Sequence, residues 1–207
     1  MNIYLIRHTE VAVGRSVAYG QSDVALAPNY EAQRERLRMH LPTDVAAVFS
    51  SPLSRCRRLA EDLAAGLSPT PPAVQFDDRL KEFHFGDWEL KPWAEIDRTL
   101  LDPWMADFVT VPTPNGEHFG DVYERVGTFW RERIEPLGET EPAGDVLVVS
   151  HGGTIRALLC LFLGVPLPNA YRLNLDYGAV SKLTRSGLTR SGLTRSGATY
   201  TIQYINR

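Results

Sequence analysis

Apolar residues gather in three short runs that predict buried β-strands. The runs are IYLI at 3–6, AAVFS at 46–50 and VLVVS at 146–150. Short runs without polar alternation are typical of strands covered on both faces. Apolar residues also recur at helical spacing in 55–67, 122–134 and 154–163. Strands that alternate with helices predict an α/β fold, here a three-layer sandwich around a mostly parallel central sheet.

The remaining segments carry turn and loop signals. Residues 69–72 predict a surface loop, and residues 100–115, with three prolines, predict an irregular excursion over the sheet edge. That excursion forms the centre of a lid-like region expected at about 80–120. Residues 183–197 repeat the sequence LTRSG three times, and an alternating stretch follows at 200–205. We therefore expect a hairpin of two late strands, lengthened by the repeat, within one domain that spans residues 1–207.

Composition narrows the class of protein. The chain has 207 residues and a formal net charge of −3, so no basic surface for nucleic acid or an anionic membrane is expected. Cys56 and Cys160 fall in predicted helices and are expected to be free thiols in a reducing compartment. The longest apolar stretch, around 157–165, is too short to span a bilayer, and no signal-peptide pattern precedes the first strand. We expect a soluble, cytoplasmic protein, either a monomer or a homodimer, whose partner is a small molecule.

Charged and imidazole side chains follow the predicted strands. They occur in four stretches: LIRHT at 5–9, SSPLSR at 50–55, LKEFHFGDWE at 80–89 and VVSHGGTIR at 148–156. The carboxyl ends of parallel strands share one edge of a sheet, where ligands bind in open α/β folds. The residues expected to meet in one pocket there are Arg7, His8, Arg55, Glu82 and His151.

These residue types suit the transfer of a phosphoryl group. Two arginines offer planar sets of donors for phosphate oxygens. The run that starts at Gly152 is expected to begin a helix whose free amide groups point at the same anion. Imidazole is a nucleophile for phosphorus, which makes His8 the candidate nucleophile and His151 a second phosphate donor. Glu82 is the candidate proton donor to the departing oxygen. No spacing typical of zinc or magnesium ligands occurs, so neither a metal nor another cofactor is expected.

The four stretches together resemble the histidine phosphatase superfamily, also called phosphoglycerate mutase-like. The matching motifs are Arg7-His8, Ser-Pro-Leu-x-Arg at 51–55, Glu-x-x-Phe-Gly-x-Trp-Glu at 82–89 and Ser-His-Gly-Gly at 150–153. The resemblance implies a phosphoglycerate mutase-like fold and transient phosphorylation of His8. It also implies that Arg7, Arg55 and His151 bind the phosphoryl group and that Glu82 donates the proton.

Further stretches resemble the α-ribazole phosphatases of cobalamin biosynthesis within that superfamily. They are RHT at 7–9, YGQSDVAL at 19–26, NGEH at 115–118 and LNLDYGAVSKL at 173–183. This resemblance implies hydrolysis of α-ribazole 5′-phosphate. The chain departs from the wider pattern at Gly14, where relatives have an asparagine that helps to hold phosphate, and Gln21 is the candidate substitute. Leu90 stands where a glycine is common.

Three other functions stay open at this point. The first is a broad-specificity or sugar-phosphate phosphatase of the same superfamily. The second is a phosphoglycerate mutase, which would have to exclude water and generally carries longer insertions. The third is a non-catalytic regulatory domain, although keeping two histidines and two arginines together without an anion would cost stability. Trp88 and Trp93 either pack beneath a loop or stack on a flat base of the substrate.

Overall fold

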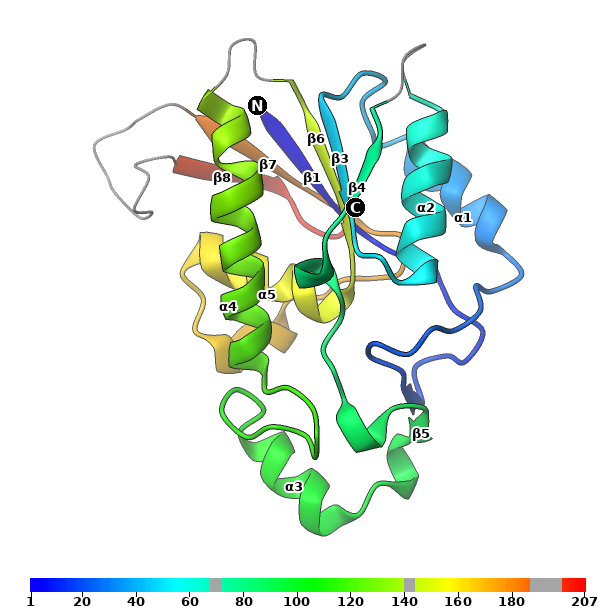
Figure 1. Cartoon of the computed structure of the whole chain (residues 1–207), viewed down its shortest axis with the longest axis vertical. Helices are drawn as coiled ribbons and strands as arrows, with labels where there is room; N and C mark the ends of the chain where they lie inside the picture. The colour runs from blue at the N-terminus through cyan, green and yellow to red at the C-terminus, as the bar shows by residue number, and fades with distance from the viewer. Residues whose placement is uncertain (68–71, 140–143, 187–198) are drawn as a thin grey trace.

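The computed structural model describes residues 1–67, 72–139, 144–186 and 199–207, and its centre is a six-stranded sheet in the order β4-β3-β6-β1-β7-β8 (Figure 1). The strands are β1 (Asn2–Arg7), β3 (Ala47–Ser50), β4 (Val74–Phe76), β6 (Val146–Ser150), β7 (Val180–Ser186) and β8 (Thr199–Tyr204). The first four are parallel, whereas β7 runs antiparallel to β1 and β8 antiparallel to β7. The predicted mostly parallel sheet is confirmed.

Helices cover both faces of this sheet. One face is covered by α1 (Tyr30–Arg38) and α2 (Ser54–Ala65) and the other by α4 (Phe119–Phe129) and α5 (Gly152–Leu163). A fifth helix, α3 (Arg98–Ala106), packs in a separate cluster. Short helical turns lie at Asp78–Leu80, Gly86–Trp88, Trp93–Glu95, Trp130–Ile134, Pro136–Glu139 and Leu167–Arg172. Ile3 and Leu5 pack in one core cluster with residues of α4 and α5, and Tyr4 and Ile6 pack in the other with residues of α1 and α2. Successive strand residues therefore feed opposite layers, as in the predicted three-layer sandwich.

Two helices that matter for the site begin or end close to the predicted residues. The helix expected at 154–163 is α5, which begins two residues earlier, at Gly152. It is terminated by Gly164, whose backbone adopts the left-handed conformation with φ +63°. The helix expected at 122–134 is α4 followed by a wider turn at Trp130–Ile134. His118 caps α4, since its ring accepts a hydrogen bond from the Asp121 amide at 3.1 Å.

The prediction of an irregular excursion over residues 100–115 is wrong for its first part, because residues 98–106 form α3 even though Pro103 lies inside it. Asp97 caps this helix by accepting a hydrogen bond from the Thr99 amide at 2.9 Å. Leu101 is buried in a cluster with Trp88 and Ile96. Capping and burial together outweigh the hydrogen bond that a proline removes, about 3 kcal/mol of helix stability.

The two-stranded ribbon of β2 (Val17–Ala18) and β5 (Lys91–Pro92) lies with α3 beyond the carboxyl ends of the parallel strands (Figure 1). Ala18 joins the small apolar cluster of Trp88, Ile96 and Leu101, so the ribbon and α3 share one core of their own. This cluster sits where the lid-like region was expected. Leu90, at the edge of the ribbon, has φ +63°, a conformation that favours the glycine common at this position.

Strands β7 and β8 form the antiparallel pair expected near the carboxyl end. The first four residues of the LTRSG repeat belong to β7, and residues 187–198 lie outside the described residues, as do residues 69–71 of the expected surface loop. Cys56 and Cys160 are both free, as predicted. Among the helices that the structure describes, none has the length and apolar character needed to cross a membrane.

Candidate active site

Strands β1 and β6 bring two histidines together at their carboxyl ends. Arg7 is in register with Ser150, and the His8 amide donates a hydrogen bond to the Ser150 carbonyl at 3.0 Å. His151 follows Ser150, so its ring lies 5.2 Å from the His8 ring, centroid to centroid. Both histidines are buried, with exposed fractions of 1% and 0%. The parallel register of two neighbouring strands thus places the predicted nucleophile beside the predicted second histidine.

The His8 ring is held in one tautomer. Its Nδ1 lies 2.7 Å from the carbonyl oxygen of Thr9, which can only accept a hydrogen bond, so Nδ1 carries the proton. Burial lowers the pKa of His8 well below its ordinary 6.5, and the guanidinium groups of Arg55 and Arg7 lower it further. At neutral pH the ring is therefore uncharged, and its Nε2 is the nitrogen that can attack an electrophile.

Arg7 and Arg55 act electrostatically on this imidazole and are themselves held by carbonyl groups. The Arg55 guanidinium donates to the carbonyls of Gly20 at 2.6 Å and Ser22 at 2.9 Å, and Arg7 donates to the Leu175 carbonyl at 2.5 Å. The Nε atoms of both arginines are buried and have no hydrogen-bond partner among the described residues. Buried donors without a partner are rare in proteins and indicate a missing acceptor, for which an anion is well suited.

His151 is positioned by Ser51 of the SSPLSR stretch and by Cys56, which follows it. Its Nε2 lies 2.8 Å from the Ser51 hydroxyl and 3.4 Å from the Cys56 sulfur. Burial lowers the pKa of His151 well below 6.5, with smaller contributions from Arg55 and His8, so this ring too is neutral at pH 7. The two imidazoles therefore lie side by side without charge repulsion.

Glu82 contacts the first turn of α5 and lies outside the buried pocket of the two histidines. Its two carboxylate oxygens accept hydrogen bonds from the Phe83 and Gly153 amides, each at 3.0 Å. A Cβ at Gly153 would stand 2.5 Å from a Glu82 oxygen, so only glycine permits this approach. The second glycine of the Ser-His-Gly-Gly motif thus makes room for the predicted proton donor.

Gly152 and Gln21 were the remaining predicted substrate-binding residues. Gly152 faces the Arg7 guanidinium, because a Cβ there would lie 3.2 Å from the Arg7 Nε, and it forms part of the cavity wall. The side-chain Nε2 of Gln21 instead donates to the backbone carbonyl of Glu82 at 3.0 Å. The structure therefore gives Gln21 a bond that connects two loops, and its role as a substitute for the phosphate-binding asparagine stays a prediction.

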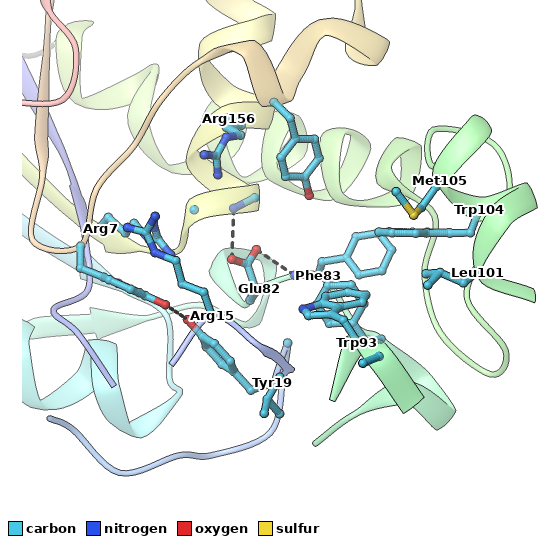
Figure 2. A pocket seen from close by; sticks show the side chains of 18 of the residues that line it. Arg7, Arg15, Tyr19, Glu82, Phe83, Trp93, Leu101, Trp104, Met105 and Arg156 are labelled. Carbon is cyan, nitrogen blue, oxygen red and sulfur yellow. Dashed lines mark hydrogen bonds between the residues drawn. The ribbon is translucent and has the colours of Figure 1, made fainter. Parts of the chain in front are cut away.

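A cavity of about 630 Å³ opens in front of Glu82. Figure 2 shows its two sides: Arg7, Arg15 and Arg156 gather on one, and Phe83, Trp93, Leu101, Trp104 and Met105 on the other. Trp93 and Trp104 are stacked, with their ring centroids 6.0 Å apart and their planes 17° apart. Of the two tryptophans considered in the sequence, Trp88 is buried and Trp93 lines the cavity. The cavity thus offers cationic groups near Glu82 and a flat apolar wall farther away.

Two tyrosines that the sequence reasoning missed separate part of the cavity from His8. The hydroxyls of Tyr19 and Tyr177 form a 2.8 Å hydrogen bond, and the two rings lie 6.4 and 5.5 Å from the His8 ring. The Arg7 guanidinium lies 4.0 Å from the Tyr177 ring, and that of Arg55 lies 5.2 Å from the Tyr19 ring. Each of the two arginines, Arg7 and Arg55, therefore stacks on one of the two tyrosine rings. Tyr19 and Tyr177 stand in loops far apart in sequence, and no local pattern indicates their contact.

The arrangement is suited to in-line displacement at phosphorus. It supplies a neutral imidazole with a bare nitrogen, unpaired arginine donors for oxygens that carry negative charge, and a carboxyl group beside the space in which a leaving group fits. Across the described parts of the chain, no group of three or more His, Cys, Asp or Glu side chains is arranged to hold a metal ion. The positive charge at this site comes from arginine.

Known structures with the same fold include phosphatases. The α-ribazole phosphatase from Shigella flexneri has a TM-score of 0.81 to this chain at 24% identity, over 100% of this chain and 96% of its own. The mycobacterial glucosyl-3-phosphoglycerate phosphatase has a TM-score of 0.79 at 25% identity, over 99% of this chain and 98% of its own. The shared architecture is the phosphoglycerate mutase-like fold, with a mostly parallel central sheet.

Sequence comparison then gives the family. A model of the histidine phosphatase superfamily (branch 1) matches residues 3–192, and the chain belongs to this superfamily. The adenosylcobalamin/alpha-ribazole phosphatase of Escherichia coli is 28% identical over 188 residues, which cover 88% of this chain and 89% of that protein. The protein is a phosphoric monoester hydrolase.

Proposed function

We propose that this protein hydrolyses a small-molecule phosphate monoester through a phosphohistidine at His8, with α-ribazole 5′-phosphate of cobalamin biosynthesis as its substrate. One observation carries the mechanism. The proton of His8 is fixed on Nδ1 by the Thr9 carbonyl, and burial together with Arg55 and Arg7 lowers its pKa, so Nε2 is an unprotonated nucleophile.

The reaction has two steps. In the first, Nε2 of His8 attacks phosphorus, the bond from phosphorus to the ester oxygen breaks, and Glu82 gives its proton to the departing oxygen. Arg7, Arg55 and His151 hold the phosphoryl oxygens. In the second step Glu82, now a carboxylate, takes a proton from water while the water oxygen bonds to phosphorus. The bond to His8 then breaks, which releases inorganic phosphate and restores the imidazole.

Two features support α-ribazole 5′-phosphate. The Escherichia coli relative carries the name adenosylcobalamin/alpha-ribazole phosphatase. In addition, the stacked rings of Trp93 and Trp104 form a flat apolar wall of the cavity, against which a planar base can stack. The cationic side then faces the phosphate and the ribose, and the aromatic side faces the base.

A broad-specificity or sugar-phosphate phosphatase is the second candidate. The size of the cavity, about 630 Å³, favours it, because a space of this volume admits leaving groups of several shapes. The related mycobacterial structure is named as a glucosyl-3-phosphoglycerate phosphatase, an enzyme that acts on a sugar derivative. Both candidates use the same two chemical steps and differ only in what the cavity holds.

The test measures phosphate release in the presence of EDTA from α-ribazole 5′-phosphate, ribose 5-phosphate, 3-phosphoglycerate and phenyl phosphate. We expect α-ribazole 5′-phosphate to have the highest kcat/KM, by about 100-fold or more over ribose 5-phosphate, because only the former fills the aromatic side. Equal and slow hydrolysis of all four esters would favour the broad-specificity candidate. A shift of phosphate between positions of phosphoglycerate, without release, would instead show a mutase.

The nucleophile is tested by substitution and by trapping. His8→Ala should lower phosphate release from every ester by about 1,000-fold or more. Brief exposure of the wild-type protein to a ³²P-labelled ester, followed by quenching in base, should give an acid-labile label on the peptide that contains His8. His40→Ala, two residues past the end of α1, is the control and should keep full activity. A fully active His8→Ala variant contradicts the mechanism.

A further inference from the structure

The arginines that line the cavity differ in their partners. Arg15 pairs with Asp176 at 3.6 Å and Arg98 pairs with Asp102 at 2.7 Å, and all four side chains are largely exposed. Arg156 also lines the cavity but, like Arg7, forms no ion pair among the described residues, and its side chain is partly buried. The Glu82 carboxylate acts on it only from farther away. A partly buried guanidinium without an ion-pair partner is costly unless another acceptor is bound beside it.

The position of the Arg156 head is fixed from two sides. Its Nε donates to the Leu173 carbonyl at 3.0 Å, and its Cζ lies 5.0 Å from the centre of the Tyr171 ring. Within the described parts of the chain no acceptor pairs with its Nη donors, which can therefore face a guest. One of them lies 3.0 Å from the point where a Cβ of Gly152 would stand, and the Arg7 Nε lies 3.2 Å from the same point. Two guanidinium groups thus meet above Gly152, where any side chain would displace them.

Arg156 belongs to the cavity and not to the buried pocket around His8. His8, Arg55 and His151 are almost completely buried and form no part of the cavity wall, whereas Arg156 and Glu82 do. Glu82 accepts a hydrogen bond from Gly153, three residues before Arg156 on the same helix. The candidate proton donor, Glu82, therefore contacts the same turn of α5 that carries Arg156. Both face the side of the site from which the ester oxygen leaves.

We propose that Arg156 determines specificity by binding an oxygen acceptor of the leaving group, a sugar hydroxyl or a carboxylate that lies a few bonds from the ester oxygen. This inference rests on the proposed phosphatase activity and adds a substrate class to it. The preferred monoester has oxygen acceptors next to the phosphate and an apolar planar part beyond them. Arg156 binds the former, and the wall of Trp93 and Trp104 contacts the latter.

The experiment compares leaving groups with and without such oxygens. Wild type, Arg156→Gln and Arg156→Lys are assayed with ribose 5-phosphate, 3-phosphoglycerate and phenyl phosphate, whose leaving group has no acceptor beyond the ester oxygen. Inhibition by vanadate, which mimics only the phosphoryl group, is measured in parallel. Arg57→Gln is the control, since Arg57 is exposed on α2, pairs with Glu61 and does not line the cavity.

We expect Arg156→Gln to lower kcat/KM for ribose 5-phosphate or 3-phosphoglycerate by about 10- to 100-fold, the effect of losing a charged hydrogen bond. The ester with the larger loss shows whether the acceptor is a hydroxyl or a carboxylate. Phenyl phosphate hydrolysis and vanadate inhibition should change by less than about threefold, and Arg156→Lys should recover part of the loss. Phenyl phosphate hydrolysis and vanadate inhibition close to those of wild type also show that Arg156→Gln is folded.

Two results overturn the proposal. An equal loss for all three esters, together with weaker vanadate inhibition, would place Arg156 among the groups that hold the transferred phosphoryl group. No loss for any ester would leave Arg156 without a role in binding. The proposed function is judged separately, because phenyl phosphate hydrolysis by the wild-type protein and its loss in His8→Ala do not depend on Arg156.

Discussion

The Glu89 carboxylate connects the loop that holds Arg55 to the loop that carries Glu82. One of its oxygens accepts hydrogen bonds from the Gln21 amide at 2.8 Å and the Phe85 amide at 3.0 Å. The other accepts from the Ser22 amide at 3.1 Å and the Ser22 hydroxyl at 2.7 Å. Because the carbonyls of Gly20 and Ser22 hold the Arg55 guanidinium, Glu89 acts on that arginine through the loop.

Glu89→Gln tests this connection while keeping the size of the side chain. With the new NH₂ group on the side of Ser22, the hydrogen bond from the Ser22 amide is lost and a donor meets a donor, while the hydrogen bonds from Gln21 and Phe85 are made to an uncharged acceptor. Each bond to a charged acceptor contributes about 1.5–3 kcal/mol, and water recovers part of this at a half-buried site, which gives a loss of about 3 kcal/mol. For a chain of this length such a loss lowers Tm by about 6–12 °C.

Thermal unfolding followed by circular dichroism measures the stability, and kcat/KM for phenyl phosphate at 20 °C measures the effect on Arg55. We expect activity to fall by about tenfold, because the loop no longer fixes the guanidinium. Glu95→Gln, at an exposed glutamate six residues further along, should change neither quantity. If Glu89→Gln melts within about 2 °C of wild type and keeps its activity, the four hydrogen bonds do not hold the loop and the reasoning fails.

Four further outcomes are expected. His8 and His151 are neutral in the fold because burial and Arg55 lower their pKa below 6.5, whereas the unfolded chain takes up protons below that pH. The free energy of unfolding should therefore fall as pH drops below about 6.5, by up to about 1.4 kcal/mol per pH unit for each histidine. Urea titrations at several pH values should show that the free energy of unfolding of His8→Gln depends less steeply on pH. Ser51→Ala removes the 2.8 Å partner of the buried His151 ring, and steady-state kinetics should show a kcat about tenfold lower, while thermal melts should show a lower Tm because the ring nitrogen loses its hydrogen bond. Leu90→Gly relieves a left-handed backbone at a 54% exposed side chain, and thermal melts should show stabilisation by up to about 1 kcal/mol; a lower Tm would show that Leu90 is unstrained. Trp104→Ala should raise KM for α-ribazole 5′-phosphate about tenfold and leave that for ribose 5-phosphate unchanged, because only the former has a base to stack.

The parts of the fold that the sequence predicted are those set by local pattern. The apolar runs at 3–6 and 146–150 became adjacent parallel strands, and the residues after them, His8 and His151, met at the shared edge. Residues 98–106 were not recognised as a helix because Pro103 is a strong local signal against one. Burial of Leu101 against Trp88 overrides that signal, and burial is a tertiary effect that the local sequence does not contain.

The same distinction explains which site residues were missed. His8 and Glu82 stand in motifs whose spacing along the chain carries information, whereas Tyr19 and Tyr177 are 158 residues apart and meet only in the folded protein. Arg156 illustrates the limit most clearly, since its place four residues after Gly152 indicates only a shared helix face. Its significance comes from what surrounds it, namely the absence of an ion-pair partner within the described chain and a position beside Glu82 on the cavity wall. Because the leaving group contacts such residues, the chemistry can be predicted from motifs while the substrate requires the structure.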